Sequence, residues 1–467
     1  MLSERILTKV IKVMTKRELA LKPTDEQFFP APNPGERYML YMHVPFCQRL
    51  CPYCSFNRYA FREDVARPYF EHMRKEMLMV KELGYDIESI YCGGGTPTIL
   101  LDELCKTLDL ARETWDIKEV ASETNPNHLT KPYLEQLTGR VQRLSVGVQS
   151  FNDDLLKQMD RYEKYGSGEE IKERIAEAEP YFDLLNVDMI FNFPSQTEEI
   201  LRKDLETLIE INAKQTTFSP LYVSSATSRK MQATLGRMDW DREYHFYRII
   251  DDTLAGGDKP RYHRSTIWTF SLNDGSAAAA GAEPGAGDMI CGGRSAGDGA
   301  AARGASKPAH IEEYQTNYDE YPAIGSGSVT HLNGNLYVNN FSIKDYNAAI
   351  DAGHMSIMGK SVMSKRDLMR YSFLVELYKL RLDKKAFQRR YGCTVEAGLP
   401  MEMAFMRANR AFATNNEEEL TLTTKGRYLT LVMYRQFLSG LNNLRDQARA
   451  ALSGEESKLT FGDGTQL

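Results

Sequence analysis

Three cysteines near the start of the chain have a spacing that suits a soft metal centre. Cys47, Cys51 and Cys54 form a C-x3-C-x2-C run just after an apolar segment at 38–44, and three thiolates on so short a loop can converge on one centre. Structural zinc needs a closed set of four ligands, usually as paired hooks, and no second hook follows this run. A four-iron, four-sulfur (4Fe-4S) cluster on three cysteines leaves one iron open to a small chelating molecule. The spacing therefore favours this cluster over zinc or a disulfide.

The residues around the run resemble the radical S-adenosylmethionine (SAM) superfamily. The lead-in to the first cysteine, YMHVPFC at 41–47, is similar to that of the oxygen-independent coproporphyrinogen III oxidase-like family. The resemblance implies that the open iron chelates the amino and carboxylate groups of SAM. It also implies that an electron from the reduced cluster splits the sulfonium and gives a 5′-deoxyadenosyl radical. In such a site the protein contributes binding, orientation and the exclusion of water.

Short apolar segments alternate with longer amphipathic ones from residue 37 to about 223. The alternation predicts a parallel sheet with crossover helices, and the six repeats predict an α/β fold, a partial (β/α)6 barrel of the radical SAM type. The expected strands cover 38–44, 87–92, 119–123, 143–148, 185–190 and 217–223. The expected helices cover 65–83, 100–114, 131–137, 153–159, 169–178 and 198–211. In such barrels the chemistry lies at the carboxyl ends of the strands.

Composition divides the chain into six segments. The core is expected at 37–270 and continues at 311–364, with a helical C-terminal domain at 365–455 that the resemblance places over the substrate entrance. Between the two core parts, 271–310 is rich in Ala and Gly and buries too little apolar surface to offset its ordering entropy. We expect no chemistry in this insertion. The remaining segments are an N-terminal amphipathic helix with a loop at 1–36 and a tail at 456–467.

Glycine and polar residues follow most of the expected strands. The run at 93–96 lets a backbone approach a ligand closely and turn its N–H groups to a carboxylate, and the resemblance assigns it to the amino-acid end of SAM. The resemblance places Tyr41, six residues before the first cysteine, near the sulfonium and makes it the predicted catalytic side chain. The resemblance implies a larger set of cofactor contacts: Tyr53, Gly93, Gly94, Gly95, Thr96, Glu123, Gln149, Arg161 and Asp188.

One position departs from the coproporphyrinogen III oxidases, which carry a further cysteine two residues after the cluster run. This chain has Phe56 there, and the segment CSFN at 54–57 is more similar to heme-trafficking proteins and to class C methyltransferases. The favoured hypothesis is C-methylation, with two SAM molecules, of a planar conjugated substrate such as a menaquinone-type quinone or a tetrapyrrole. Oxidative decarboxylation of coproporphyrinogen III in heme biosynthesis and heme trafficking are the alternatives.

Composition and charge limit the partners. The net charge of −6 gives no overall basic field, so no nucleic acid is expected, and seven cysteines without regular pairing fit a reducing cytoplasm. No apolar run approaches the ~20 residues of a membrane span. The basic, apolar segment at 2–16 predicts either a helix packed on the core or weak peripheral contact with the inner face of the membrane. The other expected partners are a small planar apolar substrate and a reductant such as flavodoxin or ferredoxin.

Overall fold

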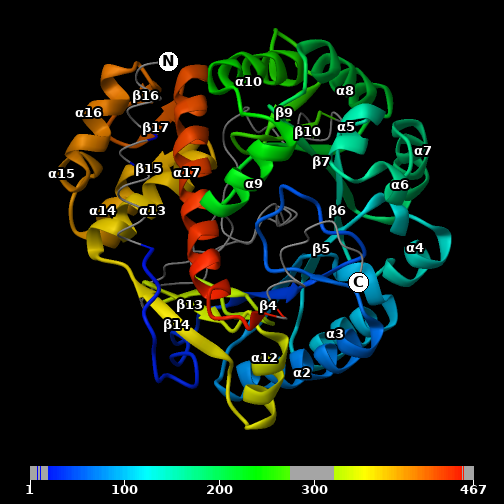
Figure 1. Ribbon diagram of the computed structural model, residues 1–467. Coiled ribbons are helices and arrows are strands. Elements are labelled where there is room, and N and C mark those ends of the chain that lie inside the picture. Colours follow the sequence, from blue (N-terminus) through cyan, green and yellow to red (C-terminus); the bar gives the residue numbers. More distant parts are fainter. Residues whose placement is uncertain (1–7, 9–10, 12–18, 274–319, 455, 457–467) are drawn as a thin grey trace.

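A nine-stranded sheet is the frame of the computed structural model, which describes residues 8, 11, 19–273, 320–454 and 456 (Figure 1). Its strand order is β11-β1-β4-β5-β6-β7-β8-β10-β9. The six central strands are parallel, and their bounds are β1 (Tyr38–Val44), β4 (Ile87–Gly94), β5 (Glu119–Thr124), β6 (Arg143–Gln149), β7 (Leu184–Phe191) and β8 (Gln215–Pro220). The order has two different ends, so the sheet of the described residues is an open barrel.

The predicted α/β fold with six βα units is confirmed, and eleven of the twelve strand bounds lie within two residues of the expected ones. The sixth strand is the exception, because it was expected at 217–223 and ends at Pro220. Its end is set by the next helix, α9 (Ser225–Leu235), whose N-cap Ser224 accepts a hydrogen bond from the Thr227 N–H. The edge strands β11 (Ala323–Ile324), β10 (Thr269–Leu272) and β9 (Tyr262–Arg264) extend the sheet beyond the six units.

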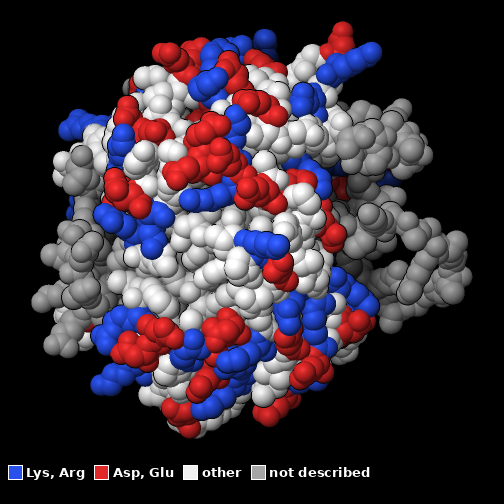
Figure 2. All heavy atoms as spheres, turned by 90° about the vertical axis from the view of Figure 1, so that its right-hand side faces the viewer, with Lys and Arg blue, Asp and Glu red and all other residues white. Residues whose placement is uncertain are grey.

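Amphipathic helices cover the outer face of the sheet (Figure 1). They are α2 (Glu63–Glu82), α3 (Leu101–Thr114), α4 (Lys131–Leu137), α5 (Asp153–Gln158), α6 (Tyr162–Tyr165), α7 (Gly168–Ala178) and α8 (Glu198–Glu210). In α2 the buried residues Ala66, Phe70, Met73 and Met77 recur every three or four positions, as one face of a helix requires. Figure 2 shows acidic and basic side chains interspersed over the side of the molecule that carries α4 and α7. No described helix is long and apolar enough to cross a membrane.

The segment expected at 311–364 to continue the core adds β11 and a second sheet, β12 (Val329–Leu332), β13 (Asn335–Asn339) and β14 (Ile357–Val362), with α12 (Ile343–Asp351). The region from 365 onward contains α13 (Lys365–Tyr378), α14 (Lys384–Tyr391), α15 (Val395–Gly398), α16 (Pro400–Ala408) and α17 (Thr424–Arg449). It also holds an antiparallel sheet, β15 (Arg381–Asp383), β17 (Glu419–Leu422) and β16 (Phe412–Asn415). This sheet was not expected in a domain predicted to be helical, since strands of three or four residues are too short to show a clear alternation.

The long helix α17 is fixed against the barrel by buried charges on α10 (Trp240–Ala255). Arg435 on α17 pairs with Glu243 at 2.5 Å, and both side chains are almost fully buried. About two turns nearer the start of α17, Arg427 pairs with Asp251 at 2.7 Å. Removing one partner of a buried pair costs roughly 3–5 kcal/mol, so these contacts fix where α17 can lie. The predicted helix at 2–16 and the predicted insertion from 274 onward lie almost wholly outside the described residues.

A buried carboxylate fastens the open edge of the barrel to α2. Glu76 has no exposed area and accepts hydrogen bonds from the Gly325 N–H at 2.7 Å, from Asn339 Nδ2 at 2.8 Å and from Tyr346 Oη at 2.6 Å. Burial raises its pKa from 4.5 to about 7 although these three donors oppose the rise. The loop at 325–328, which follows β11, is thereby held beside the end of β1.

Glu76 should make the stability depend on pH. The folded state binds this proton more tightly than the unfolded chain does, so the free energy of unfolding falls as the pH rises from about 4.5 to about 7. The loss is roughly 3 kcal/mol at most. We expect Glu76→Gln, which cannot ionise, to flatten this slope when melting temperatures are measured at several pH values across the window. Glu71→Gln, an exposed change on the same helix, should keep the slope, and an unaltered slope in Glu76→Gln would contradict the prediction.

Candidate functional site

The three cysteines lie on a loop between β1 and α2 whose two ends are held together. The short strands β2 (Phe46–Cys47) and β3 (Tyr59–Ala60) pair in parallel, and the Phe61 N–H donates to the Cys47 carbonyl at 2.9 Å. Cys47 and Cys51 are buried, Cys54 is half-buried, and all three are free thiols. The structure therefore has no disulfide at this run.

Two donors from other loops reach the cysteine sulfurs. Arg161 Nη1 lies 3.5 Å from Cys51 Sγ, and Thr96 Oγ1 lies 3.8 Å from Cys47 Sγ. Arg161 begins α6, and its Nη2 donates to Asn125 Oδ1 at 3.0 Å. Asn125 Nδ2 donates in turn to Thr96 Oγ1 at 2.8 Å. One hydrogen-bonded chain thus joins the loops after β4, β5 and β6 to both buried cysteines.

The glycine run at the end of β4 serves close packing. Gly94 has a φ of +116°, and a Cβ at Gly95 would lie 2.6 Å from the Phe46 carbonyl oxygen, so neither position accepts a side chain. The Gly94 N–H donates to Glu123 Oε2 at 3.1 Å, and the Gly95 N–H donates to the Val44 carbonyl at 2.8 Å. These two N–H groups are used within the protein, so the expectation that the whole run offers its N–H groups to a ligand carboxylate does not hold for them.

Two carboxylates face the interior of the barrel at its carboxyl end. Glu123 accepts a hydrogen bond from Tyr91 Oη at 3.1 Å, and burial, with the nearby Asp188 charge, raises its pKa to about 7. Asp188 accepts from Ser145 Oγ and Asn186 Nδ2, both at 2.7 Å, and burial raises its pKa as well. Both carboxylates remain half-buried. Such groups suit the hydroxyl or ammonium groups of a polar ligand.

Tyr41 is held by a neutral histidine. Tyr41 Oη lies 3.0 Å from His43 Nδ1, and His43 Nε2 lies 2.9 Å from the Asn57 carbonyl oxygen. Burial lowers the pKa of His43 to about 4, so the ring is uncharged at neutral pH. A carbonyl only accepts, so Nε2 carries the proton and Nδ1 accepts from the Tyr41 hydroxyl. The position of Tyr41 therefore depends on the peptide three residues after Cys54.

The remaining predicted cofactor contacts, Tyr53 and Gln149, lie at the same end of the barrel. Tyr53 packs edge-on against Phe193, with ring centroids 6.1 Å apart, in an apolar cluster that includes Cys51. Gln149 has a φ of +78° and follows a register shift between β6 and β7. Its Nε2 lies 3.0 Å from where a Cβ on Gly147 would stand. The apolar cluster around Tyr53 suits the adenine ring of a nucleoside. Gln149 departs from the regular strand next to Gly147, whose carbonyl accepts a hydrogen bond from Arg161.

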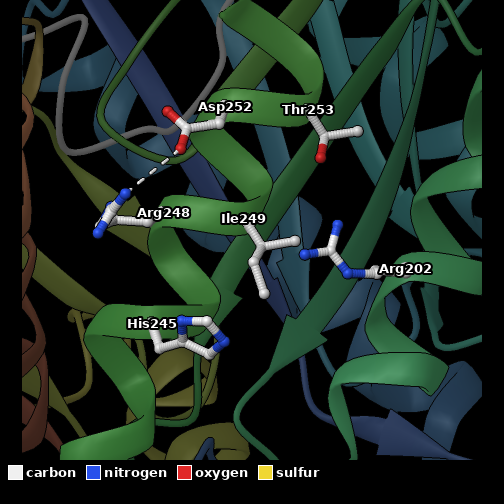
Figure 3. Close-up of a pocket in the computed structure, with 6 residues that line it drawn as sticks. All are labelled: Arg202, His245, Arg248, Ile249, Asp252 and Thr253. Carbon is white, nitrogen blue, oxygen red and sulfur yellow. Dashed lines mark ion pairs between the residues drawn. The ribbon is translucent and has the colours of Figure 1, made fainter.

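A shallow hollow of about 320 Å³ lies elsewhere, on the outer side of the molecule between α8 and α10 (Figure 3). Its charged side chains are already paired. Arg202 lies 2.7 Å and His245 2.6 Å from the carboxylate of Glu198, and Arg248 faces Asp252 at 4.0 Å. This hollow is not part of the cysteine site.

Comparison with known proteins agrees with this geometry. The model of the radical SAM superfamily matches residues 41–208, which contain the cysteine run and the loops described above. Residues 41–208 are thus similar to the radical SAM superfamily, and most of the chain is similar to proteins of the coproporphyrinogen III oxidase-like family. The heme chaperone HemW of Bacillus subtilis (strain 168) is 27% identical over 413 residues, 86% of this chain and 99% of that protein. An oxygen-independent coproporphyrinogen III oxidase of Helicobacter pylori is 24% identical over 418 residues, 85% of each chain.

The fold of the chain is also that of a solved protein. Coproporphyrinogen III oxidase (HemN) from Escherichia coli superimposes with a TM-score of 0.66 at 20% identity, over 87% of this chain and 90% of that one. The similarity extends well beyond the radical SAM core matched at 41–208. At this coverage it takes in at least part of the C-terminal region, whose helices lie at the open side of the barrel (Figure 1).

The family implies a 4Fe-4S cluster and SAM, and the residues present fit both. Burial and the neighbouring thiol of Cys54 raise the pKa of Cys47 to about 12, so a thiolate at Cys47 would need a bound cation. Cys47, Cys51 and Cys54 would hold the cluster, each on a different iron. Among the described residues, no group of three or more His, Cys, Asp or Glu side chains is placed to hold a single metal ion. Arg161 Nε is buried without a partner in the described structure, and its guanidinium stabilises negative charge at Cys51.

When bound, the cluster supplies the electron that cleaves SAM. The protein supplies position and charge. Thr96 and Arg161 orient the cysteine loop through their contacts to sulfur. Loss of such an outer contact typically lowers metal affinity or activity 10–100-fold.

Asn125 and His43 were not predicted from the sequence as site residues. Asn125 lies two residues after the predicted site residue Glu123, and His43 lies two residues after Tyr41. The period of two along a strand was the available signal, since it turns both side chains to the same face as Glu123 and Tyr41.

Cluster assembly should require each of the three cysteines. We expect Cys51→Ala to lose essentially all iron and sulfide after anaerobic reconstitution, together with the visible absorbance of the cluster, because the two cysteines left in the run are too few to hold it. Cys105→Ala is the matched control, since that thiol is buried on α3 away from the run. Full iron content in Cys51→Ala would show that the cluster assignment is wrong.

Proposed function

We propose that this radical SAM protein binds and traffics heme, and that its cluster and SAM have a regulatory part in that task. The observation that carries the proposal is Phe56, which stands where the oxidases have a further cysteine. Its ring lies under the Arg445 guanidinium at 4.7 Å, and its carbonyl accepts a hydrogen bond from Arg449 at 2.6 Å. The segment after the third cysteine is thus fixed by α17 and offers no thiol.

The relatives support the same choice. Besides the Bacillus subtilis protein, the heme chaperone HemW of Lactococcus lactis subsp. lactis (strain IL1403) is 26% identical over 412 residues, which are 85% of this chain and 96% of that protein. These two matches take in almost the whole of each heme chaperone. The Helicobacter pylori oxidase is matched over 85% of its length.

Class C methyl transfer is the second candidate, and it has the support of the same residue. The segment CSFN at 54–57 resembles those methyltransferases as well as heme-trafficking proteins, so Phe56 does not separate the two. Methyl transfer and decarboxylation both need reductive cleavage of SAM, so a low-potential reductant such as flavodoxin or ferredoxin remains a proposed partner. Weak membrane contact also remains a proposal, because the segment at 2–16 lies almost wholly outside the described residues.

Product analysis separates the three functions. The reconstituted protein is given reductant and SAM, and then heme, coproporphyrinogen III or a short-chain menaquinone analogue in separate reactions. Heme trafficking predicts roughly one heme bound per chain and little increase in 5′-deoxyadenosine with any substrate. Carbon dioxide released from coproporphyrinogen III would contradict the proposal in favour of decarboxylation. S-adenosylhomocysteine formed together with 5′-deoxyadenosine would contradict it in favour of methyl transfer.

A further inference from the structure

Three buried arginines gather between the last turns of α17 and the cysteine loop. Arg58 follows the cysteine run, Arg445 and Arg449 lie on α17, and each is only 5% exposed. They are close enough to affect one another, because burial, Arg445 and Arg58 all lower the pKa of Arg449, to about 10. Figure 1 shows this end of α17 reaching the open side of the barrel.

The carboxylates beside this group do not balance its positive charge; the other acidic groups that act on it are the thiols of Cys47 and Cys54. Arg449 pairs with Asp446 at 2.8 Å. Arg58 donates only to the Cys54 carbonyl, at 3.0 Å, and Arg445 only to Asn442 Oδ1, at 2.6 Å. Neither of these two has a carboxylate partner among the described residues. Arg58 Nη1 and Arg445 Nε are buried without any acceptor there.

The unpaired positive charge of Arg58 and Arg445 destabilises the folded protein, and it is confined to this end of α17. A buried charge without a counter-ion is strongly unfavourable, and the other buried arginines of α17 avoid this cost. Arg427 and Arg435, which lie nearer the start of the same helix, each pair with a buried carboxylate of α10. The unpaired donors therefore indicate an anion that the protein chain itself does not supply.

The surface beside the arginines is aromatic. Phe437, Leu441 and Arg445 are spaced four residues apart and lie along one stripe of α17. Phe437 packs against Tyr371 with ring centroids 5.6 Å apart, and Phe56 lies under Arg445. Both phenylalanines are only half-buried. A flat apolar ligand with an acidic group at its edge would match the rings and the unpaired donors together.

We propose that Arg58 and Arg445 bind a carboxylate of the ligand, with Arg449 adding charge behind them, while the flat part of the ligand lies along Phe56 and Phe437. The inference rests on the proposed function for the identity of that ligand, a tetrapyrrole with propionate side chains. Guanidinium groups are well suited to carboxylates because their donors match the two oxygens. A quinone with a hydrocarbon tail has no group for this site.

The test compares heme with heme dimethyl ester, which keeps the flat ring and lacks the charges. Both are titrated by absorbance into the reconstituted full-length protein. The wild type should bind heme at least tenfold more tightly than the ester, and Arg58→Gln and Arg445→Gln should each weaken heme binding about tenfold, or ~1.4 kcal/mol, and leave ester binding unchanged. Arg445→Lys should retain part of the preference. Arg248→Gln, in the hollow between α8 and α10, should alter neither affinity.

Three outcomes overturn the inference in different ways. Equal binding of heme and its ester by the wild type would exclude a carboxylate site and leave heme trafficking intact. Binding of neither porphyrin would overturn the proposed function itself. Arginine variants that lose iron, or that weaken both porphyrins alike, would show that the arginines only fasten the cysteine loop. The wild-type comparison decides the question even if a variant fails to fold.

Discussion

The cysteine loop contains only two very short strands of its own, so its shape depends on contacts made by groups elsewhere in the chain. Thr96 and Arg161 reach the sulfurs of Cys47 and Cys51 from the loops after β4 and β6, and Asn125 joins them. Each of these groups is placed by the end of a parallel strand. The sheet thus fixes the positions of the side chains that hold the loop, although the loop has little regular structure of its own. This is why the site lies at the carboxyl ends of the strands.

The loop is also held from the opposite side, by the C-terminal helix. Arg449 donates to the carbonyls of Ser55 and Phe56, and Arg58 donates to that of Cys54. The helix α17 is itself anchored to α10 through Glu243 and Asp251. A displacement of α17 would therefore break contacts to the peptides directly after the third cysteine. The helix that lies at the open side of the barrel and the cysteine loop are mechanically coupled.

The barrel strands could be predicted because each is a buried apolar run bounded by turn residues, and the cysteine run because its spacing is local. The glycines at 93–95 were also visible, although the structure assigns the N–H groups of Gly94 and Gly95 to partners within the protein. The contacts of α17 could not be predicted in this way. Arg445 contacts Phe56, which lies 389 positions earlier in the sequence (445 − 56). Nothing in the residues around Arg445 marks it as part of a site. Tertiary contacts of this kind leave no periodic signal.

Phe56 and the surplus of positive charge belong to one arrangement. An aromatic ring at this position gives Arg445 a face to stack on, and such a cation–π contact stabilises the guanidinium without using its N–H donors. A carboxylate partner from the protein would have consumed those donors, as Glu243 does for Arg435. The replacement of a cysteine by Phe56 therefore does two things at once. It removes a thiol from beside the cluster run, and it holds a buried cation in place with donors left for an external acid. Phe56 is thus the residue on which the proposed carboxylate site depends.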